Sequence, residues 1–244
     1  MVFRVAWVVA IGCSHAPAEP ARNEPPALPA PAGAGASIPL DGSIAAPALA
    51  IVETPMRWTN ERAELTLAYR RAHSDPAATD LVIAPRAIVL HYTGGGSARA
   101  TRDYFDNVRI EAERAALARA GAVNVSSHFV IDRDGTIYRL QPETRFARHC
   151  IGLNHIAIGI ENVGDDRRWP LTDAQVAADA ALVRELAARY PITHLLGHHE
   201  VMAFHDHAYY VERDARYDNS KPDPGPEFMK RVRAELADLA LAGP

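Results

Sequence analysis

The feature that most constrains the fold is a pair of uninterrupted apolar segments, residues 86–93 (RAIVLHYT) and 156–163 (IAIGIENV). A strand with one face in water alternates apolar and polar residues, whereas a strand covered on both faces is apolar almost throughout. Both segments therefore predict central strands of a sheet that carries helices on its faces. Three glycines at 94–96 follow the first segment and predict a loop there.

Helical patterns alternate with these strands. Helices are predicted at residues 60–73, 171–190 and 227–243, and a further short helix, capped by Ser97 or Thr101, is predicted through Tyr104 and Phe105. In the helix at 171–190, Thr172 and Gln175 match a capping box. In the first, we expect Leu65, Leu67 and Ala68 to face the core.

The segment 126–140 (SSHFVIDRDGTIYRL) predicts a β-hairpin, because apolar residues alternate with polar ones on both sides of Asp134-Gly135. Residues 191–200 predict a further short strand that leads into a loop. A hairpin adds an antiparallel pair to strands that are otherwise connected through helices. The expected fold class is therefore α/β, with one domain built on a central mixed sheet flanked by helices.

The N-terminal part has a different composition. Residues 1–13 (MVFRVAWVVAIGC) predict a secretory signal segment with lipoprotein-type cleavage before Cys13, which would then carry lipid. The alternatives are a frayed apolar terminus or a misassigned start. Residues 14–50 are rich in Ala and Pro and predict a disordered linker, so the folded domain is expected over 51–244. The expected location is the cell envelope, periplasmic and lipid-anchored, with Cys150 left as a single buried thiol.

Charge and cysteine content exclude several classes of protein. The net charge is −4 and the pI is about 6.3, so the chain lacks the basic field that nucleic-acid binding normally requires. Two cysteines cannot form a disulfide framework or a four-thiolate zinc site. Composition leaves the oligomeric state open.

Two histidines and one aspartate stand where chemistry is expected. His91 ends the first apolar strand, His198 ends the run ITHLLGHH, and Asp223 lies between Pro222 and Pro224. Two imidazoles and a carboxylate suit a catalytic zinc ion, which takes three protein ligands and keeps one position open. Each residue alone is more often structural than metal-binding.

Two further residues fit the same chemistry. Glu161 interrupts an apolar strand, so its carboxylate is either paired or has a raised pKa, and either state suits a general base. The alternative is that Glu161 lies at the end of the strand and faces solvent. Lys221 is one of only two lysines beside 24 arginines, and a compact ammonium can stabilise an oxyanion. The alternative is that a lysine stands at position 221 by chance.

Competing motifs are absent from the sequence. His199-Glu200 is followed by His205, six residues after the first histidine, whereas the helical zinc motif needs a spacing of four. The chain has no Gly-x-Ser-x-Gly nucleophile elbow and no phosphate-binding glycine loop.

Five ordered motifs resemble the zinc-dependent N-acetylmuramoyl-L-alanine amidases (amidase type 2), which share the peptidoglycan recognition protein fold. They are HYTGG (91–95), SSHFVIDRDGTIYRL (126–140), ARHCIGLNHIAIGIENVG (147–164), GHHEV (197–201) and KPDPGPEF (221–228). The resemblance covers about residues 80–232. It implies hydrolysis of the amide between N-acetylmuramic acid and L-alanine, in peptidoglycan or in muropeptides.

Carried over position by position, the resemblance implies a role for each candidate. His91, His198 and Asp223 would bind one Zn²⁺, Glu161 would be the catalytic carboxylate, and Lys221 would assist the oxyanion. The alternatives are a non-catalytic peptidoglycan-binding module of the same fold and an amidase that acts on soluble anhydro-muropeptides.

Three more residues lie in the same motifs. His128, His149 and Asn162 are the candidate substrate-binding residues. The alternative for His128 and His149 is a structural hydrogen-bonding histidine, and the alternatives for Asn162 are a residue that supports the site and a cap at the strand end. The partners expected are the peptidoglycan or muropeptide substrate, a membrane through Cys13 alone, and no nucleic acid.

The chain departs from compact family members between the last two predicted ligands. His198 and Asp223 are 25 residues apart, with an insertion at 202–220. The insertion leaves open whether His199 replaces His198, and whether His205 or His207 reaches the metal. We favour His198, because it follows Gly197 at the strand end. The insertion itself either forms a wall of the substrate groove or is a surface loop exposed to solvent, and the sequence favours the surface loop.

Overall fold

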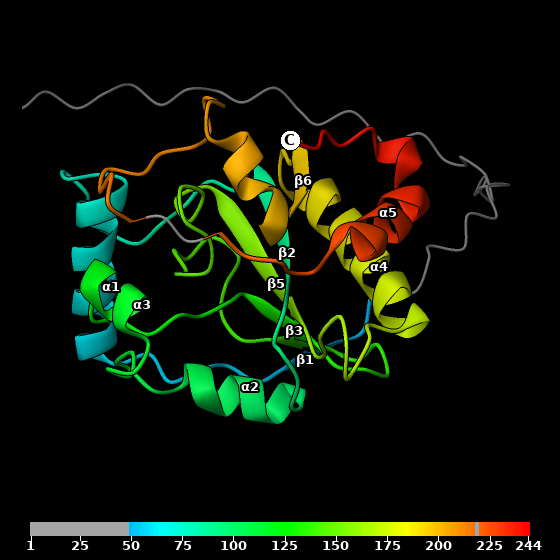
Figure 1. Cartoon of the computed structure of the whole chain (residues 1–244), viewed down its shortest axis with the longest axis horizontal. Coiled ribbons are helices and arrows are strands. Elements are labelled where there is room, and N and C mark those ends of the chain that lie inside the picture. The colour runs from blue at the N-terminus through cyan, green and yellow to red at the C-terminus, as the bar shows by residue number, and fades with distance from the viewer. Residues whose placement is uncertain (1–48, 218–219) are drawn as a thin grey trace, which may run out of the picture. The chain divides into compact units, whose positions relative to one another are not determined.

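The computed structural model describes residues 49–217 and 220–244 (Figure 1). Six strands form one mixed sheet in the order β1-β4-β3-β5-β2-β6. They are β1 (Ile51–Glu53), β2 (Ala87–Tyr92), β3 (Phe129–Ile131), β4 (Ile137–Arg139), β5 (Ala157–Asn162) and β6 (His194–Gly197). Among these strands β3 and β4 pair antiparallel and the other neighbours pair parallel, which confirms the predicted mixed α/β sheet. The predicted signal segment with Cys13, and the linker up to residue 48, lie outside the described residues.

The two apolar segments are β2 and β5, paired side by side in the sheet. Ile88 and Leu90 of β2 lie on the face covered by α4 (Asp173–Arg189) and α5 (Pro226–Glu235), within the largest hydrophobic cluster. Figure 1 shows these two helices together on one side of the sheet. Because side chains alternate along a strand, Ala87 and Val89 point to the opposite face, where a second cluster forms. Burial on both faces accounts for the absence of polar residues before the strand ends.

The hairpin and the capping box form as expected. Asp132 N donates to Thr136 O at the β3–β4 turn, and Gly135 there has φ +86°. A side chain at Gly135 would also press against the carbonyl of Ala174, at 2.9 Å. At the start of α4, Thr172 and Gln175 each bond the other's backbone, so the orphan amides of the first turn are satisfied.

The C-terminal helix is shorter than predicted. It ends at Glu235 rather than near 243, and a 3₁₀ turn, η2 (Ala237–Leu239), follows. Ala240 then takes a left-handed conformation, and Leu195 N donates to Ala242 O at 3.0 Å. The last residues thus extend the edge of the sheet beside β6 instead of continuing the helix.

The predicted buried face of the first helix is wrong. The buried residues of α1 (Asn60–His73) are Arg62, Thr66, Tyr69 and His73, whereas Leu65 and Leu67 are half-buried and Ala68 is exposed. Arg62 can be buried because its guanidinium donates to two backbone carbonyls. One belongs to Phe105, the last residue of α2 (Ala98–Phe105), and the other to Asn107, two residues later. A short helix, α3 (Ala115–Ala120), completes this side of the domain.

Within the described residues, no helix is both long enough and apolar enough to cross a membrane.

Candidate metal centre and active site

The parallel pairing brings the predicted functional residues to one edge of the sheet. His91 of β2 lies directly opposite Glu161 of β5. Leu90 pairs with Gly197 of β6, so His198 follows at the same edge, as the first residue of the 3₁₀ helix η1 (His198–Phe204). Paired residues of parallel strands project to the same face, so His91 and Glu161 share the face opposite α4 and α5.

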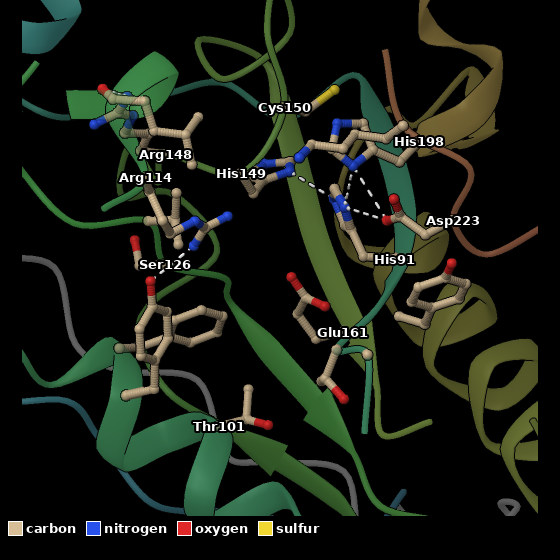
Figure 2. Close-up of a pocket in the computed structure, with 18 of the residues that line it drawn as sticks. His91, Thr101, Arg114, Ser126, Arg148, His149, Cys150, Glu161, His198 and Asp223 are labelled. Carbon is tan, nitrogen blue, oxygen red and sulfur yellow. Dashed lines mark hydrogen bonds and ion pairs between the residues drawn. The ribbon is translucent and has the colours of Figure 1, made fainter. Parts of the chain in front are cut away.

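His91, His198 and Asp223 converge on one point (Figure 2). The Nδ1 atoms of the two histidines are 2.9 Å apart, and Asp223 Oδ2 lies 3.1 Å from Nδ1 of His198 and 3.3 Å from Nδ1 of His91. All three side chains are buried. Asp223 is held in place by its backbone, because the amide of His199 donates to Asp223 O at 2.7 Å.

His149 orients one of these imidazoles. Its Nε2 lies 3.2 Å from the carbonyl of Ala157, and its Nδ1 lies 3.0 Å from Nε2 of His91. A carbonyl only accepts, so His149 Nε2 carries the proton, Nδ1 accepts from His91, and Nδ1 of His91 is left with a free lone pair. That lone pair points at the cluster, as a metal ligand requires.

The protonation states suit a cation. Burial and the neighbouring His198 lower the pKa of His91 to about 4. Burial and the charges of His91 and His128 lower the pKa of His149 well below its usual range. Burial would raise the pKa of Asp223, but hydrogen bonds with His198 and His91 outweigh it and lower that pKa. Neutral imidazoles and an ionised carboxylate are the forms that bind divalent metals.

Glu161 faces the same cavity with a free carboxylate oxygen. Its Oε2 is buried and has no hydrogen-bond partner. Burial, and then the charge of Asp223, raise the pKa of Glu161 to about 8. A carboxyl group with a pKa near neutrality can take up and return a proton at physiological pH.

A cavity of about 470 Å³ lies over this cluster. Lys221 and Cys150 line it beside the cluster, and Cys150 is the buried free thiol that was predicted. Arg114 and Tyr104 line another part, and Arg114 donates to the Tyr104 hydroxyl at 2.7 Å. Sequence reasoning missed both, because neither stands in a recognisable motif.

Two predicted substrate contacts are wrong. His128 is fully buried, with its Nε2 donating to Arg145 O and its Nδ1 accepting from Gly159 N, so it is a structural histidine. Asn162 is also fully buried, and its amide donates to Asp179 of α4 at 3.0 Å. Asn162 is one residue beyond Glu161 in the same strand, so it points to the other face of the sheet.

The structure also separates the competing histidines. Nδ1 of His199 lies 3.2 Å from the backbone oxygen of Asp223, outside the cluster. His205 packs against Tyr210, and His207 packs against His194 and Phe204. In the part of the chain that the structure describes, His198 is therefore the second histidine of the candidate metal centre.

Comparison with known proteins identifies relatives. A family model described as N-acetylmuramoyl-L-alanine amidase matches residues 82–226. The endolysin of Escherichia phage T7 is 37% identical over 86 residues, which are 33% of this chain and 57% of the endolysin. The endolysin of Enterobacteria phage T3 is 36% identical over the same shares. The chain thus spans little more than half the length of these curated relatives.

Among solved structures, the endolysin N-acetylmuramoyl-L-alanine amidase LysCS from Clostridium intestinale URNW is 25% identical. The superposition covers 77% of this chain and 95% of that one, with a TM-score of 0.48. Because the family model spans more than half of the chain and takes in His91, Glu161, His198 and Asp223, the protein belongs to the N-acetylmuramoyl-L-alanine amidase family.

Proposed function

We propose that this protein hydrolyses the amide bond between N-acetylmuramic acid and L-alanine in peptidoglycan or its muropeptides, with one Zn²⁺ held by His91, His198 and Asp223. The observation that carries the proposal is the convergence of these three buried donor atoms beneath a cavity that also holds the free carboxylate of Glu161. Membership of the amidase family supports the same reaction.

The donor set fits zinc. Ligand atoms of a tetrahedral zinc site, with bonds of about 2.0–2.1 Å, lie about 3.3–3.4 Å from one another. The three donor atoms here are 2.9–3.3 Å apart, so small adjustments would bring them to those spacings. Three protein ligands leave a fourth position open, as in catalytic zinc sites.

Each residue of the site has a distinct role in the proposed reaction. Zinc bound there would supply Lewis acidity toward the scissile carbonyl and make water more acidic. Glu161 would accept the proton of the attacking water at its free Oε2 and then pass it to the nitrogen of the departing L-alanine. Lys221, at the wall of the cavity, would stabilise negative charge on the carbonyl oxygen.

A non-catalytic peptidoglycan-binding role has less support. The metal-ligand set is complete, and a carboxylate with a raised pKa faces the cavity. A binding protein would gain nothing from keeping an unpartnered carboxylate at that position.

The location follows as a separate proposal from the sequence alone. Residues 1–13 support export and lipid attachment at Cys13, which would place the enzyme beside its polymeric substrate. Labelling of the expressed protein with a fatty acid, compared with Cys13→Ala, tests it; equal labelling of the two proteins would contradict it.

The test of the activity combines metal analysis with digestion. The purified full chain is expected to hold one zinc ion and to release L-alanine amino termini from sacculi and soluble muropeptides, with the release stopped by a chelator. Comparison of the two substrates separates cell-wall cleavage from action on soluble fragments. Glu161→Gln should lower turnover by about 10²–10⁴-fold and keep its zinc. The matched control Glu64→Gln, at an exposed position of α1, should retain turnover.

A further inference from the structure

The two metal-ligand candidates on either side of the insertion are joined by direct contacts. His198 begins η1, and Asp223 lies just before α5. The amide of His199 donates to Asp223 O at 2.7 Å, and Nδ1 of His199 lies 3.2 Å from the same oxygen. A carbonyl oxygen has two lone pairs, so it accepts from both groups when Nδ1 carries the proton. The backbone of Asp223 is thus fixed by the residue next to His198.

A charged pair, Glu200 with Arg233, joins η1 to α5. Arg233 Nη1 donates to Glu200 Oε1 at 2.7 Å, and Arg233 Nη2 donates to Glu200 Oε2 at 2.6 Å. The same Nη2 donates to the carbonyl of Leu195 in β6 at 2.8 Å, while Glu200 Oε2 accepts from the amide of Gly197 at 2.7 Å. Two parallel charge-assisted bonds fix orientation as well as distance. The Glu200–Arg233 pair therefore holds the backbone on both sides of His198 against α5.

Gly197 lets α5 approach this part of the backbone closely. A Cβ atom at position 197 would lie 2.9 Å from Cγ of Met229 in α5 and 2.7 Å from the ring of His199. Met229 is fully buried within the largest hydrophobic cluster. The residue before His198 therefore packs directly on α5, and the Glu200–Arg233 pair connects the same two segments through polar contacts.

The insertion is held by other parts of the domain. In its described part, Val211 N donates to Gly152 O at 2.9 Å, and Arg213 N donates to His73 O at 3.0 Å. The insertion is therefore attached to the domain along part of its length rather than solvated throughout. The contacts that join η1 to Asp223 and α5 run directly between these segments, so they do not depend on the path of the insertion.

We infer that Glu200 and Arg233 are positioning residues of the metal centre, which hold His198 at the spacing from Asp223 that one divalent cation requires. The inference rests on the proposed function, because it concerns the same zinc site. The pair acts through the backbone of Gly197 and through α5, which begins shortly after Asp223. Donor atoms that are already held in place lose less conformational freedom when a cation binds. The pair should therefore raise the affinity for zinc.

The test measures zinc affinity by competition with a chromophoric chelator. The full chain is compared with Glu200→Gln, Arg233→Met and the double variant. Each single substitution should weaken zinc binding by about tenfold, the lower end of the range for groups that support metal ligands. The double variant should bind zinc no more weakly than the single variants, because either substitution already breaks the pair. Arg233→Lys keeps the charge and should bind zinc more tightly than Arg233→Met.

A second arginine–carboxylate pair provides the matched control. Arg184 of α4 donates to the two carboxylate oxygens of Asp238 at 2.6 and 2.7 Å, and to the carbonyl of Glu235 at 2.6 Å. These partners lie in η2 and at the end of α5, rather than in the segments that carry the metal-ligand candidates. Arg184→Met should therefore keep the wild-type zinc affinity.

Urea unfolding of the metal-free proteins separates positioning from a general structural role. A pair that only stabilises the fold would lower the free energy of unfolding in the variants and leave the zinc affinity of the folded protein unchanged. That result, or equal weakening of zinc binding by Arg184→Met, would overturn the inference. Circular dichroism checks folding before each titration, and Glu200→Gln, which keeps the size of its side chain, decides the question if Arg233→Met does not fold.

Activity of the wild type distinguishes failure of the inference from failure of the proposed function. A wild type that cleaves peptidoglycan, with variants that bind zinc as tightly as it does, would overturn the positioning role alone. A wild type that binds zinc more tightly than the variants but releases no L-alanine amino termini would overturn the proposed activity alone. A wild type that binds no zinc would overturn both.

Discussion

At the scale of single residues, His149 shows how one side chain prepares another for metal binding. It accepts from Nε2 of His91 and donates to a backbone carbonyl, so the lone pair of His91 is directed at the cluster. The sequence placed His149 near the site but left its role between substrate contact and structural histidine. The structure adds a positioning role, since its two nitrogens are engaged with His91 and Ala157.

His149→Phe should lower zinc affinity, because the tautomer and orientation of His91 would no longer be held. Loss of such a supporting hydrogen bond typically costs about 10–100-fold in metal affinity. Competition with a chromophoric chelator measures it. His205→Phe, at an exposed histidine directly after η1, is the control. Unchanged affinity in His149→Phe would show that His91 needs no such support.

A second buried carboxyl group lies on the other face of the sheet. Asp179 of α4 accepts from Asn162 through Oδ2, while Oδ1 of each residue has no partner. Burial raises the pKa of Asp179 to about 8. A protonated Asp179 would donate from Oδ1 to the free oxygen of Asn162 and complete a two-bond pair.

Asp179 therefore makes the stability depend on pH. The unfolded aspartate has a pKa near 3.8 and the folded one about 8, so the folded state holds the extra proton between these values. The free energy of unfolding should fall as pH rises from about 4 to about 8 and then level off. Asp179→Asn should flatten this part of the profile in urea titrations. An unchanged slope would mean that Asp179 is ionised in the folded protein.

At the scale of elements, helix α1 shows where hydrophobic patterning fails. Its buried face is formed by arginine, threonine, tyrosine and histidine, because each polar group meets a specific acceptor or aromatic ring in its neighbours. A pattern of apolar residues cannot reveal such a face, since the acceptors of Arg62 and His73 lie 43 and 47 residues away. The strands and α4 were predictable because their burial depends on apolar contact alone.

The contact between α1 and residues 205–217, the segment that follows η1, should be sensitive to pH, because His73 Nδ1 lies 2.8 Å from Glu212 Oε1. Burial opposes the charged form of His73, but hydrogen bonds to Glu212 and Ala120 outweigh it and raise its pKa. Stability from a raised histidine pKa is fully present below the unfolded value of about 6.5 and is lost as pH rises through the folded pKa. Glu212→Gln should therefore destabilise the protein at pH 6 more than at pH 9, measured by denaturant unfolding. Equal loss at both pH values would exclude an ionic contact.

At the scale of the whole molecule, the metal centre joins parts of the chain that are far apart in sequence. β2, the start of η1 and the segment before α5 each contribute one donor atom. A cation bound there would contact all three parts in the folded state, and the unfolded chain would not present this site. Its removal should therefore lower the stability of the entire domain.

Zinc at 100 times its dissociation constant should raise the free energy of unfolding by about 2.7 kcal/mol. Thermal unfolding with zinc and with chelator measures the difference as a shift in Tm. His198→Ala removes one ligand and should abolish the shift. A shift that persists in this variant would locate the stabilising metal elsewhere.

The sequence by itself determined strands β2 to β6 and the metal-ligand candidates, whereas the edge strand β1 was not predicted. Apolar runs identified β2 and β5, turn residues identified the hairpin, and ordered motifs singled out His91, His198, Asp223 and Glu161. These signals are local, because they depend on residues adjacent or nearly adjacent along the chain. Strand-end residues could be placed together only because parallel strands end at a common edge.

Only the tertiary structure decided which of the remaining polar residues take part. His128 and Asn162 lie in the same motifs as the site, yet their side chains are buried against Arg145 and Asp179. Tyr217 lines the cavity, although the insertion that contains it was predicted to be a solvent-exposed surface loop. The direction of a side chain and the path of a long loop depend on contacts between distant segments, and no local pattern encodes those contacts.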